Sequence, residues 1–265
     1  MANKISLSYQ DFKKISKYCN KKKINFLSTA FDLKSIDFLK TLKMKYFKIP
    51  SGEITNLPYL LKIGKLRRKI FISTGMSNIN EINQAIKALT TSGTVKKNII
   101  VMQCNTEYPS PLNDANLKAM LTIKKRFKVN IGYSDHTLGI DACLWATAMG
   151  ARVIEKHITL NRSFVGPDHK ASIEEKDLKT LVKKIRLLEI AMGNGEKKVT
   201  KSEKKNLSIA RNSLVASTEI KKGEKFTKKN ITAKRPGTGI SPMLINKVIG
   251  KIAKKNFQHD ELIKI

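Results

Sequence analysis

The chain has 265 residues, of which 41% are hydrophobic and 28% are charged, and its formal net charge is +31. This length and composition are typical of a folded globular protein that buries a substantial core. No apolar run approaches the roughly 18 residues that a membrane-spanning helix needs, so an integral membrane protein is excluded.

The sequence shows no sign of export. Its first residues, Met-Ala-Asn-Lys-Ile-Ser, contain no apolar segment of the kind found in a signal peptide. The cysteines Cys19, Cys104 and Cys143 are odd in number and unevenly spaced, which favours reduced thiols over a disulfide framework. We therefore expect a cytoplasmic protein that is not bound to a membrane.

The large positive charge would ordinarily indicate nucleic acid or an anionic membrane as the partner. The lysines are instead scattered over most of the expected helices and loops, as Lys13, Lys62, Lys118 and Lys183 illustrate, and aromatic residues are only 6% of the chain. This distribution favours solvated lysine-rich faces over a nucleic-acid-binding role. A basic surface would also help to attract a phosphorylated substrate.

From the N-terminus to about residue 195, β-rich runs alternate with amphipathic stretches. A helix is expected first, over residues 8–21, and the later helical stretches include 79–89, 116–127, 141–150 and 173–192. The expected strands are, in chain order, Ile24–Thr29, Tyr46–Ser51, Lys69–Thr74, Asn98–Cys104, Val129–Ser134 and Arg152–Ile158. Strands that alternate with helices of this length predict parallel β/α units.

Each expected strand is followed by a polar cluster. The clusters occupy residues 28–29, 48–53, 73–75, 105–108, 134–136 and 155–159. In a (β/α) barrel the carboxyl ends of all strands meet at one rim, where substrates bind. The pattern predicts a TIM-type (β/α) barrel that is incomplete, with about six of the eight units of a closed barrel. Either the sheet is open or two leading β/α units are absent from this polypeptide.

Beyond residue 195 the composition of the sequence and the length of its segments change. Residues 196–209 are polar and lysine-rich and are expected to form a linker, which gives a catalytic domain over residues 1–195. Residues 210–265 contain short segments, including Ser213–Ala216 and Asn230–Ala233, that are separated by glycine and proline. These segments predict a small, irregular β-rich domain.

Two histidines stand at the polar ends of neighbouring strands. His136 lies in Gly-Tyr-Ser-Asp-His-Thr and His157 in Glu-Lys-His-Ile-Thr. In a strand–helix–strand unit both imidazoles reach the same rim, and period-two alternation places Ser134 beside His136 and Glu155 beside His157. The pair suggests a metal site, although two unrelated strand-end histidines remain an alternative on this evidence.

The residue sequences of these clusters resemble the motifs of a known family. The relevant motifs occur in the order Lys48–Glu53, Ser73–Met76, Cys104–Pro109, Gly132–Thr137, Glu155–His157, Gly166–Lys170 and Lys234–Gly237. They are similar to those of the bacterial sialic acid synthases, which make N-acetylneuraminate or its relative legionaminate. The resemblance implies a TIM barrel followed by an antifreeze-like (SAF) domain. It also implies that phosphoenolpyruvate is condensed with N-acetylmannosamine or a diacetamido analogue.

The resemblance assigns roles at the rim. His136 and His157 would bind a divalent metal, most often Mn²⁺ in the family, with Mg²⁺ or Co²⁺ as alternatives; imidazole together with oxygen ligands suits Mn²⁺. Glu155 would tune His157 or assist proton transfer, and the sequence does not choose between these roles. The residues that match family positions for the phosphorylated carboxylate are Lys48, Ser51, Ser73 and Ser134.

The sugar would be held by a second group of residues. Within the rim these are Thr29, Asn105, Thr106 and Tyr108, together with Asp168, which is also a catalytic candidate. Arg235 matches an arginine of the small domain that recognises the N-acetyl group across a domain-swapped homodimer. As alternatives, Tyr108 could be a packing aromatic, Asp168 a turn residue, and Lys48 and Arg235 solvated cations.

The sequence also departs from the family pattern. The family begins with about two more β/α units, so this chain is expected to be an N-terminally shortened or split form. Gln103 stands where histidine is common, and Thr106 aligns with a family asparagine while Asn105 is one step away. The remaining alternatives are an inactive sugar-binding or assembly protein and an aldolase-like enzyme with a Schiff-base lysine at Lys48 or Lys156.

Overall fold

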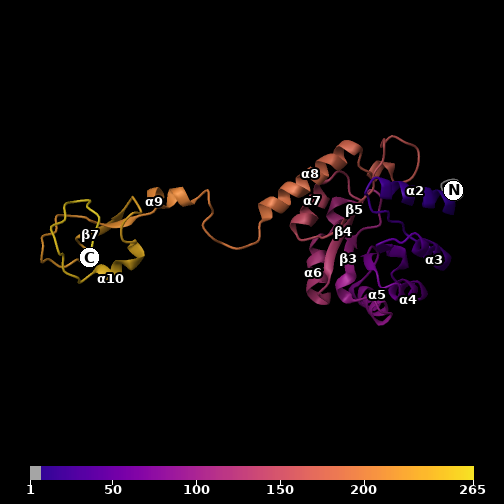
Figure 1. Ribbon diagram of the computed structural model, residues 1–265, viewed down its shortest axis with the longest axis horizontal. Coiled ribbons are helices and arrows are strands. Elements are labelled where there is room, and N and C mark those ends of the chain that lie inside the picture. The colour runs from indigo at the N-terminus through magenta and orange to yellow at the C-terminus, as the bar shows by residue number, and fades with distance from the viewer. Residues whose placement is uncertain (1–6) are drawn as a thin grey trace. The chain divides into compact units, whose positions relative to one another are not determined.

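The computed structural model describes residues 7–265 of the chain. Residues 1–6, on which the expected absence of a signal peptide depends, lie outside the described part. The chain divides into two compact units, one that extends to Gly193 and one that comprises Asn194–Ile265, and each is described by itself (Figure 1).

The first unit begins with two helices and then alternates strands and helices. Its strands are β1 (Tyr46–Ile49), β2 (Lys69–Ser73), β3 (Ile99–Cys104), β4 (Asn130–Asp135) and β5 (Ile154–Lys156). Its helices are α2 (Tyr9–Lys21), α3 (Leu33–Thr41), α4 (Leu57–Lys65), α5 (Ile79–Thr91), α6 (Lys118–Phe127), α7 (Asp141–Ala148) and α8 (Glu175–Met192). Among residues 7–265, no helix combines the length and the apolar composition that a membrane span requires.

The strands form one parallel sheet in the order β1-β2-β3-β4-β5, so each pairs with its neighbour in the chain. Parallel neighbours joined by helices are the repeating unit of a (β/α) barrel, and the curled sheet is an incomplete barrel, as expected. The strand expected over Ile24–Thr29 is wrong: only Thr29 pairs, through a single parallel bridge to Lys48. This segment lies at the free edge of the sheet and has no second neighbour to extend its ladder.

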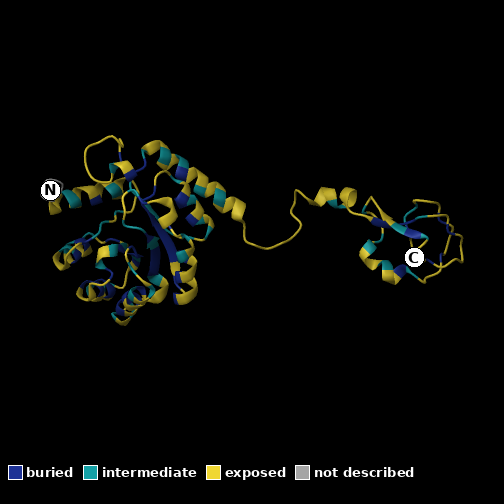
Figure 2. Cartoon of the chain, turned by 180° about the vertical axis from the view of Figure 1, so that it is seen from behind, coloured by how far each residue is buried: buried dark blue, intermediate teal, exposed yellow. Residues whose placement is uncertain are grey.

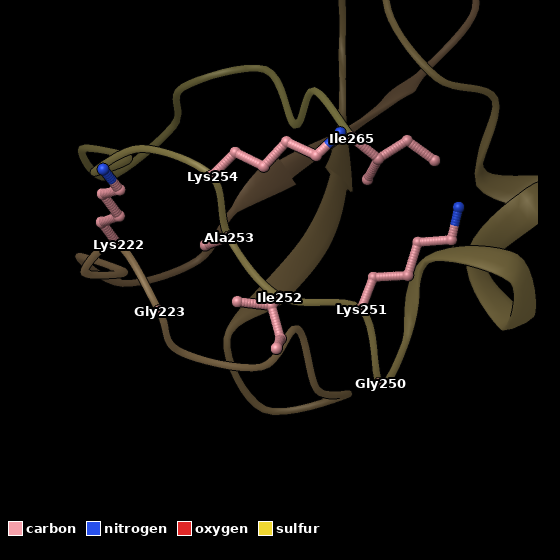
Figure 3. Close-up of a pocket in the computed structure, with 8 residues that line it drawn as sticks. All are labelled: Lys222, Gly223, Gly250, Lys251, Ile252, Ala253, Lys254 and Ile265. Carbon is pink, nitrogen blue, oxygen red and sulfur yellow. The ribbon is translucent and has the colours of Figure 1, made fainter.

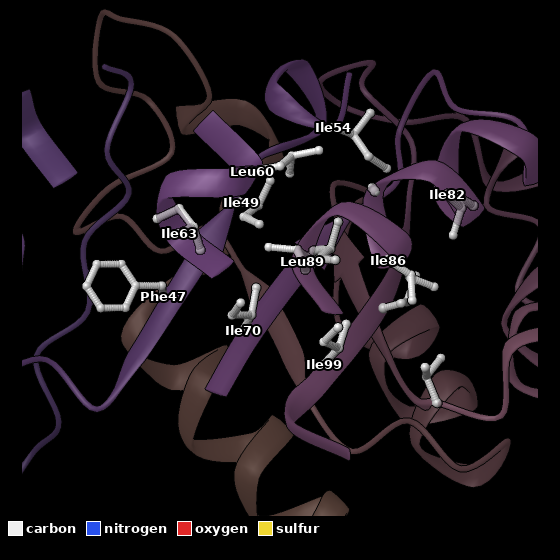
Figure 4. Packing of buried hydrophobic residues seen from close by; sticks show 14 of the residues in the cluster. Phe47, Ile49, Ile54, Leu60, Ile63, Ile70, Ile82, Ile86, Leu89 and Ile99 are labelled. Atoms are coloured by element: carbon white, nitrogen blue, oxygen red, sulfur yellow. The ribbon is translucent and has the colours of Figure 1, made fainter. Parts of the chain in front are cut away.

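Helices cover one face of the sheet, and the main core lies between them and the strands. Strand alternation sends Phe47 and Ile49 of β1 toward the helices, together with Ile70 of β2. Figure 4 shows Ile49 beside Leu60 of α4 and Ile70 beside Leu89 of α5, while Phe47 lies on the side of Ile63 of α4. The helices are buried along this side and exposed along the other (Figure 2). This packing fixes the opposite strand face toward the barrel interior.

The expected helices are present, with small differences at their ends. Ser8 is the N-cap of α2, where its hydroxyl accepts a hydrogen bond from Asp11 N and the Asp11 carboxylate accepts from Ser8 in return. This capping box explains why the helix starts at the polar residue that the sequence indicated. Helix α8 begins at Glu175, two residues later than expected, because Ile173 pairs with Ile158 in a parallel bridge.

The second unit is small and irregular. Strands β6 (Ser213–Ala216) and β7 (Ile231–Lys234) form an antiparallel pair, and the helices are α9 (Leu207–Ala210) and α10 (Ile245–Val248). Its own core includes Leu214, Phe226 and Phe257, whose side chains are fully buried. A separate core shows that this unit packs independently of the sheet in the first unit.

Candidate functional site

A pocket of about 310 Å³ lies at the carboxyl ends of the strands in the first unit. Strand alternation directs Lys48, Ser134 and Glu155 toward the barrel interior, opposite the core-facing residues. The predicted site residues that line this pocket are Thr29, Lys48, Ser51, Ser73, Thr106, Tyr108, Ser134, His136, Glu155 and His157. The structure therefore brings together side chains that are up to 128 positions apart in the chain (157 − 29).

One side of the pocket carries an ion pair in which the lysine is buried and the carboxylate is partly exposed. The Lys48 ammonium lies 2.9 Å from Glu155 Oε1, and the Lys48 side chain is only 8% exposed. Ser134 Oγ also donates to Glu155 Oε1, at 3.3 Å. A cation that is withdrawn from water and held by one carboxylate oxygen keeps further N–H donors for an anionic ligand. This arrangement does not match the alternative of a solvated strand-end lysine.

Two serines lie next to this cation. Ser73 Oγ is buried, lines the pocket and has no hydrogen-bond partner among the residues that the structure describes. A buried hydroxyl without a partner costs free energy that a ligand can recover. Ser51 reaches the pocket because β1 ends at Ile49 and a 3₁₀ turn over Ser51–Glu53 follows.

Gly75 holds the loops that carry these serines close together. Its backbone N–H donates to Ser51 Oγ at 3.0 Å. A Cβ at this position would lie 2.5 Å from Thr106 Cγ2 and 2.9 Å from Ser51 Oγ. The approach of the two loops thus requires a residue without a side chain.

The two histidines lie side by side at the rim. The ring centroids of His136 and His157 are 5.2 Å apart, with an interplanar angle of 70°. His136 Nδ1 bonds to the backbone carbonyl of Asn105, and because a carbonyl only accepts, Nδ1 carries the hydrogen and Nε2 has a free lone pair. Burial lowers the pKa of His136, so the ring is neutral at pH 7. His157 Nδ1 lies 3.8 Å from Asp168 Oδ2.

This geometry fits a divalent metal ion. Two imidazole nitrogens that lie about 2.0–2.2 Å from one ion, at adjacent coordination positions, place their ring centroids about 4.5–5.5 Å apart, and the observed separation falls in this range. Anchoring of the second ring nitrogen to a carbonyl is typical of metal-binding histidines. Within residues 7–265 no cluster of three or more His, Cys, Asp or Glu side chains is arranged to hold a metal. The pair would therefore supply two protein ligands and leave positions open.

Tyr108 stacks beside the histidines. Its ring centroid is 4.0 Å from that of His136 and 5.5 Å from that of His157. Burial raises the pKa of Tyr108 to about 12, so the phenol keeps its proton at neutral pH. The side chain can therefore donate a hydrogen bond into the pocket as well as pack against the imidazoles.

Three predicted residues do not line the pocket. Asn105 Oδ1 accepts from Glu107 N at 2.7 Å and from Ser110 Oγ at 3.1 Å, so the Asn105 side chain shapes its own loop. Asp168 lies at the edge, next to His157. Arg235 is exposed and belongs to the second unit.

The pocket also contains residues to which the sequence analysis gave no role. They are Phe31, Pro50, Gly52, Met76 and Cys104. Cys104 is the last residue of β3 and is the register partner of Ser134, so strand alternation alone could have found it. Burial raises the pKa of the Cys104 thiol, which keeps it protonated and argues against a nucleophile.

The structure separates the two lysines that were considered for a Schiff base. Lys48 lines the pocket, whereas Lys156 does not. The Lys156 ammonium instead pairs with Asp135 Oδ2 at 2.8 Å on the opposite face of the sheet. Strand alternation explains this difference, because Glu155 and His157 flank Lys156 and both point into the pocket.

The second unit has a larger pocket, of about 720 Å³. Figure 3 shows its lining, in which Lys222, Lys251 and Lys254 are accompanied by small and apolar residues and by Ile265. This lining contains no histidine, acidic side chain or cysteine. It therefore lacks the acid–base and ligating groups of the pocket in the first unit, which remains the candidate site.

Comparison with known proteins agrees with this architecture. The model of the NeuB family matches residues 1–197, and the SAF domain model matches residues 211–265. An N,N'-diacetyllegionaminic acid synthase of Campylobacter jejuni is 53% identical over 264 residues, which are 100% of this chain and 79% of that protein. A protein of the same name from Legionella pneumophila is 40% identical, over 97% of this chain and 72% of that protein.

A solved structure gives the same result. The N-acetylneuraminic acid synthetase of Leptospira borgpetersenii superposes with a TM-score of 0.72 at 31% identity, over 76% of this chain and 70% of that one. The solved structure, the NeuB model and the relatives thus agree on the barrel, and the SAF model and the relatives, which span nearly the whole chain, agree on the small domain. The chain is therefore an enzyme of the NeuB family and carries a SAF domain at its C-terminal end.

Proposed function

We propose that the chain condenses phosphoenolpyruvate with an N-acetylated amino sugar to give a nine-carbon sialic acid and phosphate. The observation that carries this proposal is the convergence of a buried lysine, a buried serine hydroxyl without a partner and two neighbouring imidazoles in one pocket. The first two suit a phosphorylated carboxylate and the third suits a metal-assisted carbonyl reaction.

The anionic substrate would occupy the side of the pocket that Lys48 lines. The Lys48 ammonium has N–H groups left after it pairs with Glu155, and Ser73 Oγ lacks a partner. Phosphate and carboxylate oxygens accept hydrogen bonds from such donors. Ser51 borders the same space and would add a donor, while Ser134, whose hydroxyl donates to Glu155, would hold that carboxylate beside the substrate.

The sugar would lie toward the two histidines. His136 and His157 would hold a divalent ion, for which Mn²⁺ is the leading candidate, and the bound ion would polarise the aldehyde oxygen of the sugar as a Lewis acid. Tyr108 keeps its proton and would donate to a sugar oxygen, and Asp168 at the edge would accept from a hydroxyl. Thr29 and Thr106 border the remaining space.

The reaction forms one carbon–carbon bond and breaks one carbon–oxygen bond. Carbon 3 of phosphoenolpyruvate attacks the aldehyde carbon, and the aldehyde oxygen takes up a proton. Water then adds at carbon 2 and phosphate leaves with the bridging oxygen. Glu155 would accept the proton of this water, because its carboxylate is held by Lys48 and Ser134 at the anion side of the pocket.

Among possible sugars we favour a 2,4-diacetamido-trideoxymannose over N-acetylmannosamine. The two relatives described above are both named as N,N'-diacetyllegionaminic acid synthases. The test is phosphate release from phosphoenolpyruvate and Mn²⁺ with each sugar in turn. Faster release with the diacetamido sugar is expected, and release with neither sugar, in a chain that binds phosphoenolpyruvate, would contradict the catalytic proposal.

We further propose that the active form is a homodimer in which Arg235 of one copy reaches the pocket of another. Support comes from the exposure of Arg235 on the second unit and from the resemblance described above. An Arg235→Ala chain and a His157→Ala chain should each be inactive alone. Mixed by co-expression, they should regain activity, because one site of each mixed dimer has both groups intact. No recovery from two inactive variants would show that Arg235 acts within its own chain, and activity of Arg235→Ala alone would show that Arg235 has no role.

A further inference from the structure

A second buried ion pair lies on the face of the sheet that points away from the pocket. Asp135 Oδ2 and Lys156 Nζ are 2.8 Å apart, and their side chains are 0% and 4% exposed. Cys143 of α7 also donates to Asp135 Oδ2, at 3.1 Å. The pair is thus enclosed between the sheet and this helix, and no substrate can reach it.

The position of this pair in the sheet is specific. Asp135 and Lys156 are register partners on β4 and β5. Each directly precedes a pocket histidine, since His136 follows Asp135 and His157 follows Lys156. The ion pair therefore joins the two strands one residue before the point at which the imidazoles project.

The pair also holds the backbone that leaves His136. Thr137 N donates to Asp135 Oδ1 at 2.9 Å, and Lys156 Nζ donates to the carbonyl of Thr137. Both backbone polar groups of Thr137 are therefore satisfied by the two side chains of the pair. As a result, the strand end that carries His136 is tied directly to the residue that precedes His157.

We propose that the Asp135–Lys156 pair is a positioning device, which sets the separation of the two imidazoles at the value a shared cation requires. Burying two charges adds little net stability compared with apolar residues of the same size. The contribution of the Asp135–Lys156 pair is geometric, because the pair fixes the two strand ends that carry His136 and His157. This inference rests on the proposed metal-binding role of His136 and His157.

The test replaces the pair by neutral residues of similar shape. In Asp135→Asn/Lys156→Met, the amide still accepts from Thr137 N, whereas the bond to the Thr137 carbonyl and the link between the strands are lost. Mn²⁺ binding to the metal-depleted full chain, measured by calorimetry without substrates, should weaken about 10–100-fold. An unchanged Mn²⁺ affinity in the folded variant would overturn the inference.

A matched control separates positioning from general destabilisation. Thr94 is buried in the loop before β3, at the other end of the strands, and its hydroxyl donates to the Gly64 carbonyl at 2.9 Å. Thr94→Val should lower the melting temperature and leave the Mn²⁺ affinity unchanged. A loss of Mn²⁺ affinity in both variants would show that the effect is one of overall stability.

Three further variants distinguish failure of this inference from failure of the proposed function. If His136→Ala and His157→Ala bind Mn²⁺ as the unmodified chain does, the proposed function fails and not merely the positioning role. If this double variant does not fold, Asp135→Asn/Lys156→Leu gives the same comparison, because it also removes the link between the strands, leaves no buried charge without a partner and retains the acceptor for Thr137 N. Wild-type Mn²⁺ affinity in that variant would also overturn the inference.

Discussion

Replacing Lys48 by methionine should separate the binding of phosphoenolpyruvate from the stability of the fold. The change keeps the length of the side chain and removes the ammonium that lies 2.9 Å from Glu155 Oε1. A hydrogen bond to a charged group contributes about 1.5–3 kcal/mol, and each 1.4 kcal/mol is a factor of ten. The Kd for phosphoenolpyruvate, measured by calorimetry, should therefore rise roughly ten- to hundredfold.

The effect of Lys48→Met on stability should be smaller than for a fully buried pair. Breaking such a pair costs about 3–5 kcal/mol because one charge is left without a partner. Here the Glu155 side chain is 39% exposed, so water can solvate the carboxylate that remains. We expect the free energy of unfolding, measured with urea, to fall by about 1–2 kcal/mol after discounting for this exposure.

The control for this prediction is the same change at an exposed ion pair. Lys62 Nζ lies 2.6 Å from Asp37 Oδ2 on the surface, where the two side chains are 30% and 66% exposed. Lys62→Met should change the free energy of unfolding by less than about 1 kcal/mol and leave substrate binding unchanged. If Lys48→Met weakens the binding of phosphoenolpyruvate no more than Lys62→Met does, the assignment of the anion site to Lys48 is refuted.

Three further changes test other parts of the structure. Tyr59→Phe should lower the free energy of unfolding by about 1–3 kcal/mol, because the Tyr59 hydroxyl donates to the buried Ala30 carbonyl at 2.7 Å; an unchanged urea midpoint would contradict this. Gly75→Ala should weaken phosphoenolpyruvate binding, since its Cβ would lie 2.5 Å from Thr106 Cγ2; adding Thr106→Ser, which lacks that methyl, should restore part of the loss. Burial lowers the pKa of His136 below 6.5, so as the pH falls the imidazole of the unfolded chain binds a proton before that of the folded chain does. The free energy of unfolding should therefore be unaffected above about pH 6.5 and should decrease as the pH falls through the lower pKa of the folded chain. His136→Asn should show a shallower decline in urea denaturation across that range.

The sequence predicts the parallel β/α order because hydrophobic periodicity and polar strand ends are local properties. It fails at Ile24–Thr29, whose residues favour a strand, but of which only Thr29 pairs, through one bridge to Lys48; pairing depends on how the segment lies against β1, which no local pattern encodes. Lys156 is a second position at which the sequence is misleading. Its neighbours Glu155 and His157 suggest a rim residue, yet alternation turns its side chain under α7, where Asp135 satisfies it.

The site is predicted less completely than the fold. Residues on strand ends, such as Ser134 and His136, can be placed from alternation alone. Phe31 and Met76 reach the pocket from loops, and loop paths depend on contacts that no periodicity encodes. Asn105 is the opposite case, a predicted site residue whose side chain does not line the pocket. Its amide shapes the loop that presents the Asn105 backbone carbonyl to His136.

The first residues of the second unit have a practical consequence. Residues 194–206 are exposed throughout and include Lys197, Lys198, Lys201, Lys204 and Lys205. Exposed, lysine-rich backbone outside compact structure is cleaved readily by trypsin. Brief digestion should release two resistant fragments, which would allow the melting of the barrel portion and of the C-terminal module to be recorded one at a time.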